Sequence, residues 1–125
     1  VIQSIDWDST PFLFGYVVCT AKPTAEVPLI TERGDPLLIY RNSMSQYTAT
    51  GRVGAMTHTE HIRDEYWNGG PALDIYAVED YDDSIDVEPE TVNRLLDYKK
   101  SFWPQGLWRV SDDRPTERVI REFNI

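Results

Sequence analysis

Aromatic side chains beside turn residues are the groups in this sequence best suited to binding chemistry. The chain of 125 residues contains four Trp and seven Tyr. Trp67 follows Tyr66 in the stretch Asp64-Glu-Tyr-Trp-Asn-Gly-Gly70, a loop setting where an indole ring can stand at a pocket mouth and stack on a flat ligand. Stacking on an aromatic ring stabilises a bound base by about 1–3 kcal/mol, and the same ring face attracts a methylated cation. Trp67 could equally cover a hydrophobic core, and the sequence leaves both roles open.

Metal ligands and nucleophiles are scarce in this chain. His58 and His61 are its two histidines, and the residues after them add only carboxylates, so solvated loop histidines are favoured over a ligand pair. Asp82 and Asp83 are adjacent carboxylates, which in a turn usually serve solvation and not a metal. The single Cys19 lies in an apolar run and indicates a small buried side chain. We therefore expect no catalytic residue, no metal and no cofactor.

The negative charge is concentrated in one segment. The chain has 21 acidic and 12 basic residues and a formal net charge of −9. Residues 74–90 contain eight carboxylates and no Lys or Arg, whereas the rest of the chain is nearly balanced. This composition excludes nucleic-acid binding by charge alone, and it leaves a single base held in an aromatic pocket as the mode least affected. Many Asp and only three Lys would also suit a source adapted to high salt.

Length and hydropathy indicate one soluble domain. With 41% hydrophobic and 26% charged residues, the chain fits one compact core that spans residues 1–125. No apolar run approaches the ~20 residues that cross a bilayer, and no basic segment leads into an apolar run at the N-terminus. These features predict a cytoplasmic protein with no membrane partner.

The elements that position these groups follow from hydrophobic pattern and turn residues. The pattern predicts strands over 12–20, 37–40, 47–56 and 72–78, with Gly51 and Gly54 marking a bulge or a close backbone approach. One helix should begin at Pro89 and end near Ser101, and a second should begin near Arg114. Trp103 and Trp108 are expected to pin the first helix to the sheet. The fold class is α+β, a curled sheet or partly open β-barrel of about five to six strands with two to three flanking short helices.

The order of the motifs resembles a known family. Gly34-Asp-Pro-Leu-Leu-Ile-Tyr40, Thr50-Gly-Arg-Val-Gly54, the Trp67 loop and Ala72-Leu-Asp-Ile-Tyr-Ala-Val78 are similar to the PUA-like superfamily, specifically its EVE and YTH branch. Phe102-Trp103, then Trp108-Arg-Val-Ser111 and a final amphipathic helix, are similar to the C-terminal segment of EVE domains. The resemblance implies a non-enzymatic reader that recognises a modified, methylated base flipped into an aromatic pocket.

The resemblance also implies which residues bind. In YTH-type domains one wall of the aromatic cage is a Trp just before the strand that here begins at Ala72, and Trp67 matches it. A second aromatic wall has no counterpart in segment 26–33, so Leu29 or a Tyr would replace it. The implied base pocket contains Trp67, Tyr66, Thr20, Leu29, Ile30 and Thr31, and the candidate phosphate contacts are Lys22, Arg33, Arg41, Asn42, Ser43 and Arg109. Residues 41–43 fit an ordinary hairpin loop equally well.

The implied partner is DNA or RNA carrying a modified base, together with a fused or associated effector domain, as in modification-dependent restriction or RNA regulation. Two other classes stay open. Residues 74–90 could make the chain an acidic protein–protein interaction domain or a DNA mimic. A nucleoside-processing enzyme of the ASCH-like type would need Lys22 with Glu26 or Glu32 at the pocket, and it is the less favoured class.

Overall fold

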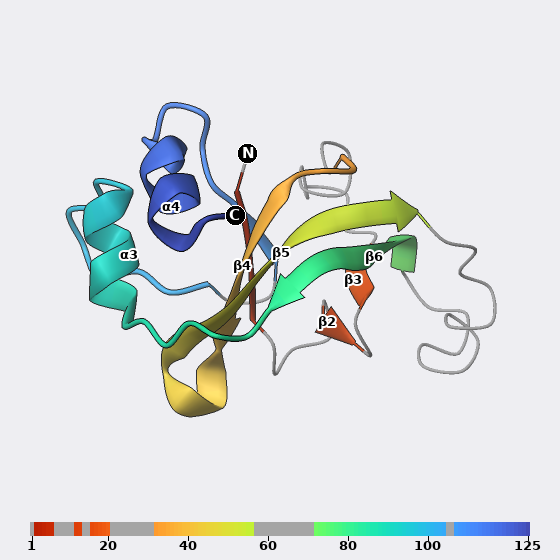
Figure 1. Cartoon of the computed structure of the whole chain (residues 1–125), viewed down its shortest axis with the longest axis horizontal. Helices are drawn as coiled ribbons and strands as arrows, with labels where there is room; N and C mark the ends of the chain where they lie inside the picture. The colour runs from red at the N-terminus through yellow and green to blue at the C-terminus, as the bar shows by residue number, and fades with distance from the viewer. Residues whose placement is uncertain (1, 7–11, 14–15, 21–31, 57–71, 105–106) are drawn as a thin grey trace.

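The structure is a computed structural model of the whole chain, and it describes residues 2–6, 12–13, 16–20, 32–56, 72–104 and 107–125. Seven strands form one sheet in the order β2-β3-β6-β5-β4-β1-β7 (Figure 1). The strands are β1 Gln3–Asp6, β2 Phe12–Leu13, β3 Tyr16–Thr20, β4 Pro36–Arg41, β5 Gln46–Met56, β6 Ala72–Asp82 and β7 Leu107–Arg109. The helices are the 3-10 turn η1 Asn42–Met44, α3 Pro89–Leu95 and α4 Thr116–Phe123. β1 pairs in parallel with β4, and the other pairs are antiparallel.

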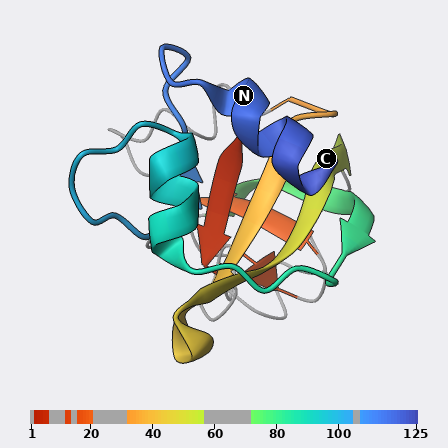
Figure 2. The ribbon, with the colours of Figure 1, turned by 60° about the vertical axis from the view of Figure 1, so that its left-hand side comes forward.

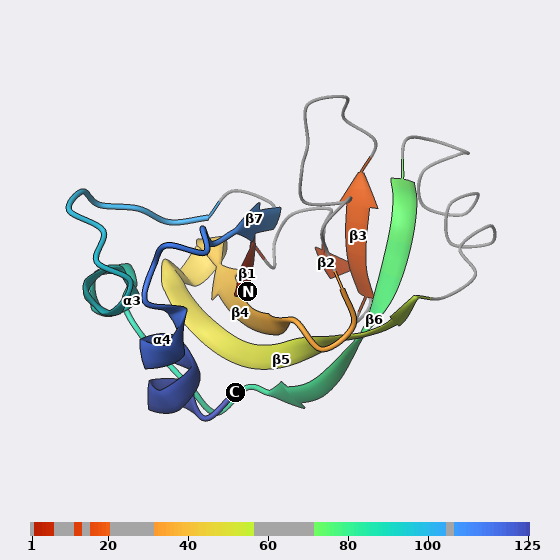
Figure 3. The same ribbon diagram turned by 90° about the horizontal axis from the view of Figure 1, so that it is seen from above.

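Strand β5 gives the sheet its curl. Its register with β6 shifts between Thr50 and Arg52 and again between Val53 and Met56. A Cβ atom on Gly54 would lie 2.8 Å from the Glu79 Cγ and 3.0 Å from the Ala77 carbonyl oxygen, so only glycine fits there. Bulges increase local twist, and Figure 3 shows β5 as a strongly curved strand. The predicted bulge and close approach are confirmed, and so is the curled sheet.

Strand β4 is buried on both faces and joins two hydrophobic clusters. On one face Leu37 and Ile39 pack with Ala49 and Val53. On the other face Leu38 and Tyr40 belong to the cluster that the helices cover, with Ile2, Tyr47, Val92, Leu96, Val110 and Val119. Figure 2 shows α3 and α4 side by side over this part of the sheet. On α4, Val119 is buried and Ile120 and Phe123 pack against the same cluster.

Four strand predictions needed correction. The run 12–20 is a hairpin and not one strand, because β2 and β3 pair with Phe12 opposite Val17. Strand β6 continues past Val78 to Asp82, because the backbone of Glu79 still pairs with Arg52 on β5. β1 and β7 were not predicted, and they raise the strand number to seven. Both are short, and their pairing partners are remote in sequence, which a local pattern does not reveal.

Helix α3 ends at Leu95 and not near Ser101 as predicted. Asp97 has a left-handed backbone with φ of 62°. Its N–H donates to the Arg94 carbonyl at 3.2 Å, and the Tyr98 N–H donates to the Asn93 carbonyl at 2.8 Å. This pair of bonds is the Schellman motif that closes a helix, and it turns the following segment back across the end of α3.

Candidate functional site

Two cavities share Ser101 and Phe102 as lining residues, one along α3 and the other beyond its end. The larger cavity has a volume of about 620 Å³ and lies between α3, η1 and residues 101–103. The smaller cavity has a volume of about 430 Å³ and lies between residues 97–102 and Arg114. Ser101 and Phe102 line both. We call the larger one the acidic cavity and the smaller one the basic cavity, after the charged residues that line each.

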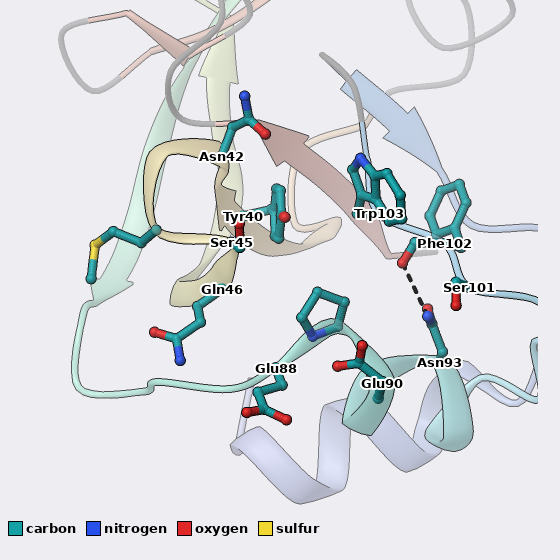
Figure 4. A pocket seen from close by; sticks show the side chains of 12 residues that line it. Tyr40, Asn42, Ser45, Gln46, Glu88, Glu90, Asn93, Ser101, Phe102 and Trp103 are labelled. Atoms are coloured by element: carbon teal, nitrogen blue, oxygen red, sulfur yellow. Dashed lines mark hydrogen bonds between the residues drawn. The ribbon is translucent and has the colours of Figure 1, made fainter.

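Asn93 holds the segment that separates the two cavities. Its backbone carbonyl accepts the N–H of Tyr98, and its side-chain Nδ2 donates to the Phe102 carbonyl at 3.0 Å (Figure 4). One residue of α3 therefore fixes both ends of the turn-back that follows the helix. The Asn93 Oδ1 is buried and has no hydrogen-bond partner among the residues that the structure describes. An unsatisfied buried acceptor costs about 1–3 kcal/mol, so this atom favours a ligand that donates an N–H or O–H.

The acidic cavity combines aromatic rings with carboxylates. Glu88 and Glu90 lie at the start of α3, and Trp103 stands across from them with 48% of its surface exposed (Figure 4). Among the residues that the structure describes, none that lines this cavity is Lys, Arg or His; the described lining consists of Tyr40, Asn42, Met44, Ser45, Gln46, Glu88, Pro89, Glu90, Asn93, Ser101, Phe102 and Trp103. Such a cavity attracts a planar or cationic group and repels an anion.

Tyr40 gives this cavity a rigid wall. Its ring packs edge-on against Tyr47, with ring centroids 5.1 Å apart, and both side chains belong to the buried cluster under the helices. Burial raises the pKa of the Tyr47 hydroxyl far above its usual range, with the neighbouring Tyr40 as the next cause. Tyr47 therefore stays neutral and acts as a structural support.

The basic cavity is built around a row of stacked groups. The Arg114 guanidinium lies 4.3 Å from the centre of the Tyr98 ring, and Tyr98 stacks on Phe102 with centroids 5.0 Å apart. Phe102 continues the row to Trp108 on β7, at 5.2 Å. Lys99 and Lys100 are exposed at the cavity, and within the described part of the chain neither takes part in an ion pair. The exposed Asp97 also lines the cavity, so its charged side chains are three cations and one carboxylate, with a net charge of +2. A site of net positive charge beside aromatic rings can hold a phosphate and an adjoining flat ring.

The expected role of the two tryptophans is therefore divided. Trp108 contacts Phe102, which stacks on Tyr98 in the turn after α3, so this Trp does help to join the helix to the sheet. Trp103 instead lines the acidic cavity with its ring half-exposed.

The structure also places most of the predicted phosphate contacts. Arg33 forms an exposed ion pair with Glu79 at 3.0 Å, and Arg109 pairs with Asp112 at 2.7 Å. Arg41 ends β4, and the exposed Asn42 and Ser43 form η1, with Asn42 lining the acidic cavity. Lys22 lies outside the described residues. Arg33 thus pairs with Glu79 of the acidic segment 74–90, so positive and negative charge lie together here.

Most of the predicted base pocket cannot be compared with the structure. Trp67, Tyr66, Leu29, Ile30 and Thr31 lie outside the described residues. The backbone of Thr20 ends β3 and pairs with Ala72 at the start of β6. Lys22 and Glu26 of the nucleoside-processing alternative are also outside, and Glu32 is exposed, with its N–H donating to Asp35.

The sequence-based prediction missed Tyr98, Lys99, Lys100 and Arg114. A usable signal was present, because Lys99 and Lys100 are two of the three lysines and stand together between aromatic residues. The pattern assigned them to a helix that in fact ends before them. The described part of the chain holds no group of three His, Cys, Asp or Glu that could bind a metal ion. It also contains no helix with the length and apolar character needed to cross a bilayer.

Comparison with known proteins adds a likeness in three dimensions. No protein-family model and no curated protein matches the chain. A solved structure of ASCH from Zymomonas mobilis matches it with a TM-score of 0.55 and 10% identity, covering 96% of this chain and 94% of that chain. The chain shares the fold of this ASCH protein. Two mutants of the same protein match similarly, with TM-scores of 0.56 and 0.55, 10% identity, and coverage of 96% and 97% of this chain and 96% and 95% of theirs.

The likeness extends over almost the whole length of both chains, so it concerns the arrangement of the sheet and helices together. The expectation of a curled sheet with helices beside it agrees with this shared fold, and membership of the PUA-like superfamily stays a prediction. The narrower EVE or YTH type stays a prediction. At 10% identity the comparison concerns fold alone.

Proposed function

We propose that this chain is a non-enzymatic nucleic-acid-binding domain that reads one base, with the basic cavity holding a backbone phosphate. The observation that carries the proposal is the juxtaposition of Lys99, Lys100 and Arg114 with the Tyr98 and Phe102 rings. Phosphate oxygens are bound by such cations, and the aromatic faces suit a neighbouring base. This cluster is a local positive site on a chain of net charge −9, so binding does not depend on overall charge.

We further propose that the base carries a methyl group or another modification and enters a pocket formed by Trp67, Tyr66, Thr20, Leu29, Ile30 and Thr31. Strand pairing supports this grouping, because β3 ends at Thr20 directly opposite Ala72, where β6 begins. Figure 3 shows the end of β3 beside the start of β6. The chain leaves β3 toward Leu29 and enters β6 from Trp67, so the two strand ends next to these stretches are neighbours. The energy of unstacking the base would be offset by stacking on Trp67 and by hydrogen bonds to the base edge.

Fluorescence anisotropy with short labelled oligonucleotides tests both parts. Single- and double-stranded oligonucleotides carrying plain, methylated or hydroxymethylated bases are titrated with the protein at several salt concentrations. The variant Lys99→Gln/Lys100→Gln should bind about tenfold more weakly, and its salt dependence for single strands should fall by about 1.4 in the slope of log K. Trp67→Ala should lose the preference for the modified base while keeping the salt-dependent part.

The matched control is Arg118→Gln/Arg121→Gln on α4, which removes the same charge from exposed positions outside both cavities. It should bind like the unaltered protein. Equal binding of plain and modified oligonucleotides by the unaltered protein would contradict base reading. Equal loss in the two double variants would show that only net charge matters, and the basic cavity would then not be the binding site.

A further inference from the structure

We propose that the acidic cavity binds an arginine side chain presented by a basic segment of a partner protein. This site lies on the opposite side of Ser101 and Phe102 from the basic cavity. The inference is independent of nucleic-acid binding, and it concerns a different ligand.

The charge of the lining sets the sign of the ligand. Glu88 and Glu90 contribute two negative charges, and no lining residue in the described part of the chain is positive. They flank the start of α3, where the helix dipole supplies at most about half a positive charge. Two full charges exceed this, so the cavity stays negative and favours a cation over a phosphate.

The surroundings reinforce this sign. The end of β6 carries Asp80 and Asp82, and the segment that leads from it into α3 carries Asp83 and Asp86; all four are exposed. Hydrogen bonds from Ser84 lower the pKa of Asp82, so this carboxylate is ionised at neutral pH. A basic segment would be steered along this stretch toward the cavity, because complementary charge raises association rates.

The unsatisfied acceptor selects the kind of cation. Within the described ranges the Asn93 Oδ1 is buried without a hydrogen-bond partner, and Asn93 as a whole is only 7% exposed. Its Nδ2 is already used by the Phe102 carbonyl. A guanidinium has five N–H donors in one plane, so it can donate to Oδ1 while other donors reach Glu88 or Glu90. A lysine ammonium is compact and lacks this planar spread.

The aromatic wall points to the same ligand. Trp103 faces the cavity with about half of its ring surface open, and Figure 4 shows it across from Glu90 and beside Phe102. A guanidinium stacks on an indole face through cation–π attraction, which is strongest for Trp. Met44 and Pro89 supply apolar surface for the side-chain stem. A volume of about 620 Å³ suffices for one such side chain.

Isothermal titration with three peptides tests the proposal on the full chain. The peptides share one Gly- and Ser-containing sequence and carry at the centre arginine, lysine or citrulline, the neutral analogue of arginine. We expect the arginine peptide to bind about tenfold more tightly than the lysine peptide, and the citrulline peptide to show no measurable binding. In the protein, Glu88→Gln/Glu90→Gln should weaken arginine binding about tenfold, and Trp103→Ala should weaken it by a similar factor.

Both glutamates are exposed, so their replacement leaves the core unchanged. The matched control is Glu117→Gln/Glu122→Gln on α4, which removes two exposed carboxylates outside both cavities and should bind like the unaltered protein. Asn93→Leu removes the acceptor but also the bond to Phe102, so the glutamate and tryptophan variants decide the outcome.

Three results would overturn the proposal. The first is absence of binding by the arginine peptide at low salt, and the second is equal binding of the arginine and citrulline peptides. The third is displacement of the peptide by an oligonucleotide whose own binding is weakened in Trp103→Ala, because the cavity would then hold a base. Neither of the first two results affects the proposed nucleic-acid site. That site is tested separately, through the binding of oligonucleotides by the unaltered protein and by the Lys99→Gln/Lys100→Gln variant.

Discussion

Asn93 shows how one polar side chain in a hydrophobic position can organise a site. It follows the buried Val92 in α3, and its amide and carbonyl together hold Tyr98 and Phe102. The sequence pattern marks Val92 and Leu96 as core positions but gives no sign that Asn93 is buried as well. The partners of Asn93 depend on the helix ending just after it. Residue roles of this kind are therefore beyond prediction from periodicity.

The buried Tyr47 leads to a prediction about alkaline pH. Burial raises the pKa of its hydroxyl, whereas a tyrosine in the unfolded chain ionises near pH 10. Above about pH 10 the unfolded state releases this proton first, so the free energy of unfolding should fall, by up to about 1.4 kcal/mol per pH unit. Below pH 10 the contribution is fully present. Tyr47→Phe removes the hydrogen bond with Ser4, lowering stability near neutral pH by about 1 kcal/mol, but it should flatten the alkaline decline.

Urea unfolding at several pH values between neutrality and pH 11 measures this difference. Tyr81→Phe is the matched control: partial burial and then Asp83 also raise the pKa of Tyr81, but this side chain is exposed, so its replacement should flatten the alkaline decline less than Tyr47→Phe does. If the curves of Tyr47→Phe and the unaltered protein stay parallel above pH 10, Tyr47 is not the group responsible.

At the scale of elements, the end of α3 makes a second prediction. Asp97 adopts a left-handed backbone, with φ of 62°, that glycine adopts without steric cost. Asp97→Gly should therefore raise the free energy of unfolding by about 0.5–1 kcal/mol, and the β-branched Asp97→Val should lower it by about 1–2 kcal/mol. The bond from Arg114 to the Asp97 carbonyl uses the backbone and persists in both variants. Urea denaturation measures both, and a loss of stability in the glycine variant would contradict the assignment.

The same helix end explains which elements the sequence could predict. Strands β4 and β5 and helix α4 were predicted closely, because each has a local apolar pattern bounded by turn residues. The end of α3 was missed because the left-handed position that closes a helix is usually a glycine, and here it is Asp97. β1 and β7 were missed because each is defined by its partner; Ser4, for example, pairs with Leu38 on one side and Trp108 on the other. The basic cavity follows from these two features, so its residues were missed with them.

At the scale of the whole molecule, charge along the chain differs from charge in space. The sequence concentrates the excess of negative charge in residues 74–90 and leaves the rest of the chain nearly balanced. In the fold, Glu79 of that segment pairs with Arg33, whereas Glu88 and Glu90 lie just across Ser101 and Phe102 from the basic cavity. Opposite charges thus alternate over short distances. The curled sheet was predictable from local patterns and turn residues, but this charge arrangement depends on strand pairing and on the turn after α3.

The uncompensated part of the acidic segment leads to the last prediction. Asp80, Asp82, Asp83 and Asp86 are exposed and close in sequence, and no salt bridge joins them to a cation within the described residues. Their mutual repulsion opposes folding and is screened by salt, since the Debye length shrinks from about 30 Å at 0.01 M to about 3 Å at 1 M. The melting temperature should therefore rise by a few degrees (~3–6 °C per kcal/mol gained) as NaCl increases over this range. Asp83→Asn/Asp86→Asn should melt higher at low salt and gain less from NaCl, whereas Glu117→Gln/Glu122→Gln, on a helix of mixed charge, should gain as much as the unaltered protein. Calorimetry measures these shifts, and a melting temperature that falls with NaCl would mean that attractive pairs such as Arg33 and Glu79 outweigh the repulsion.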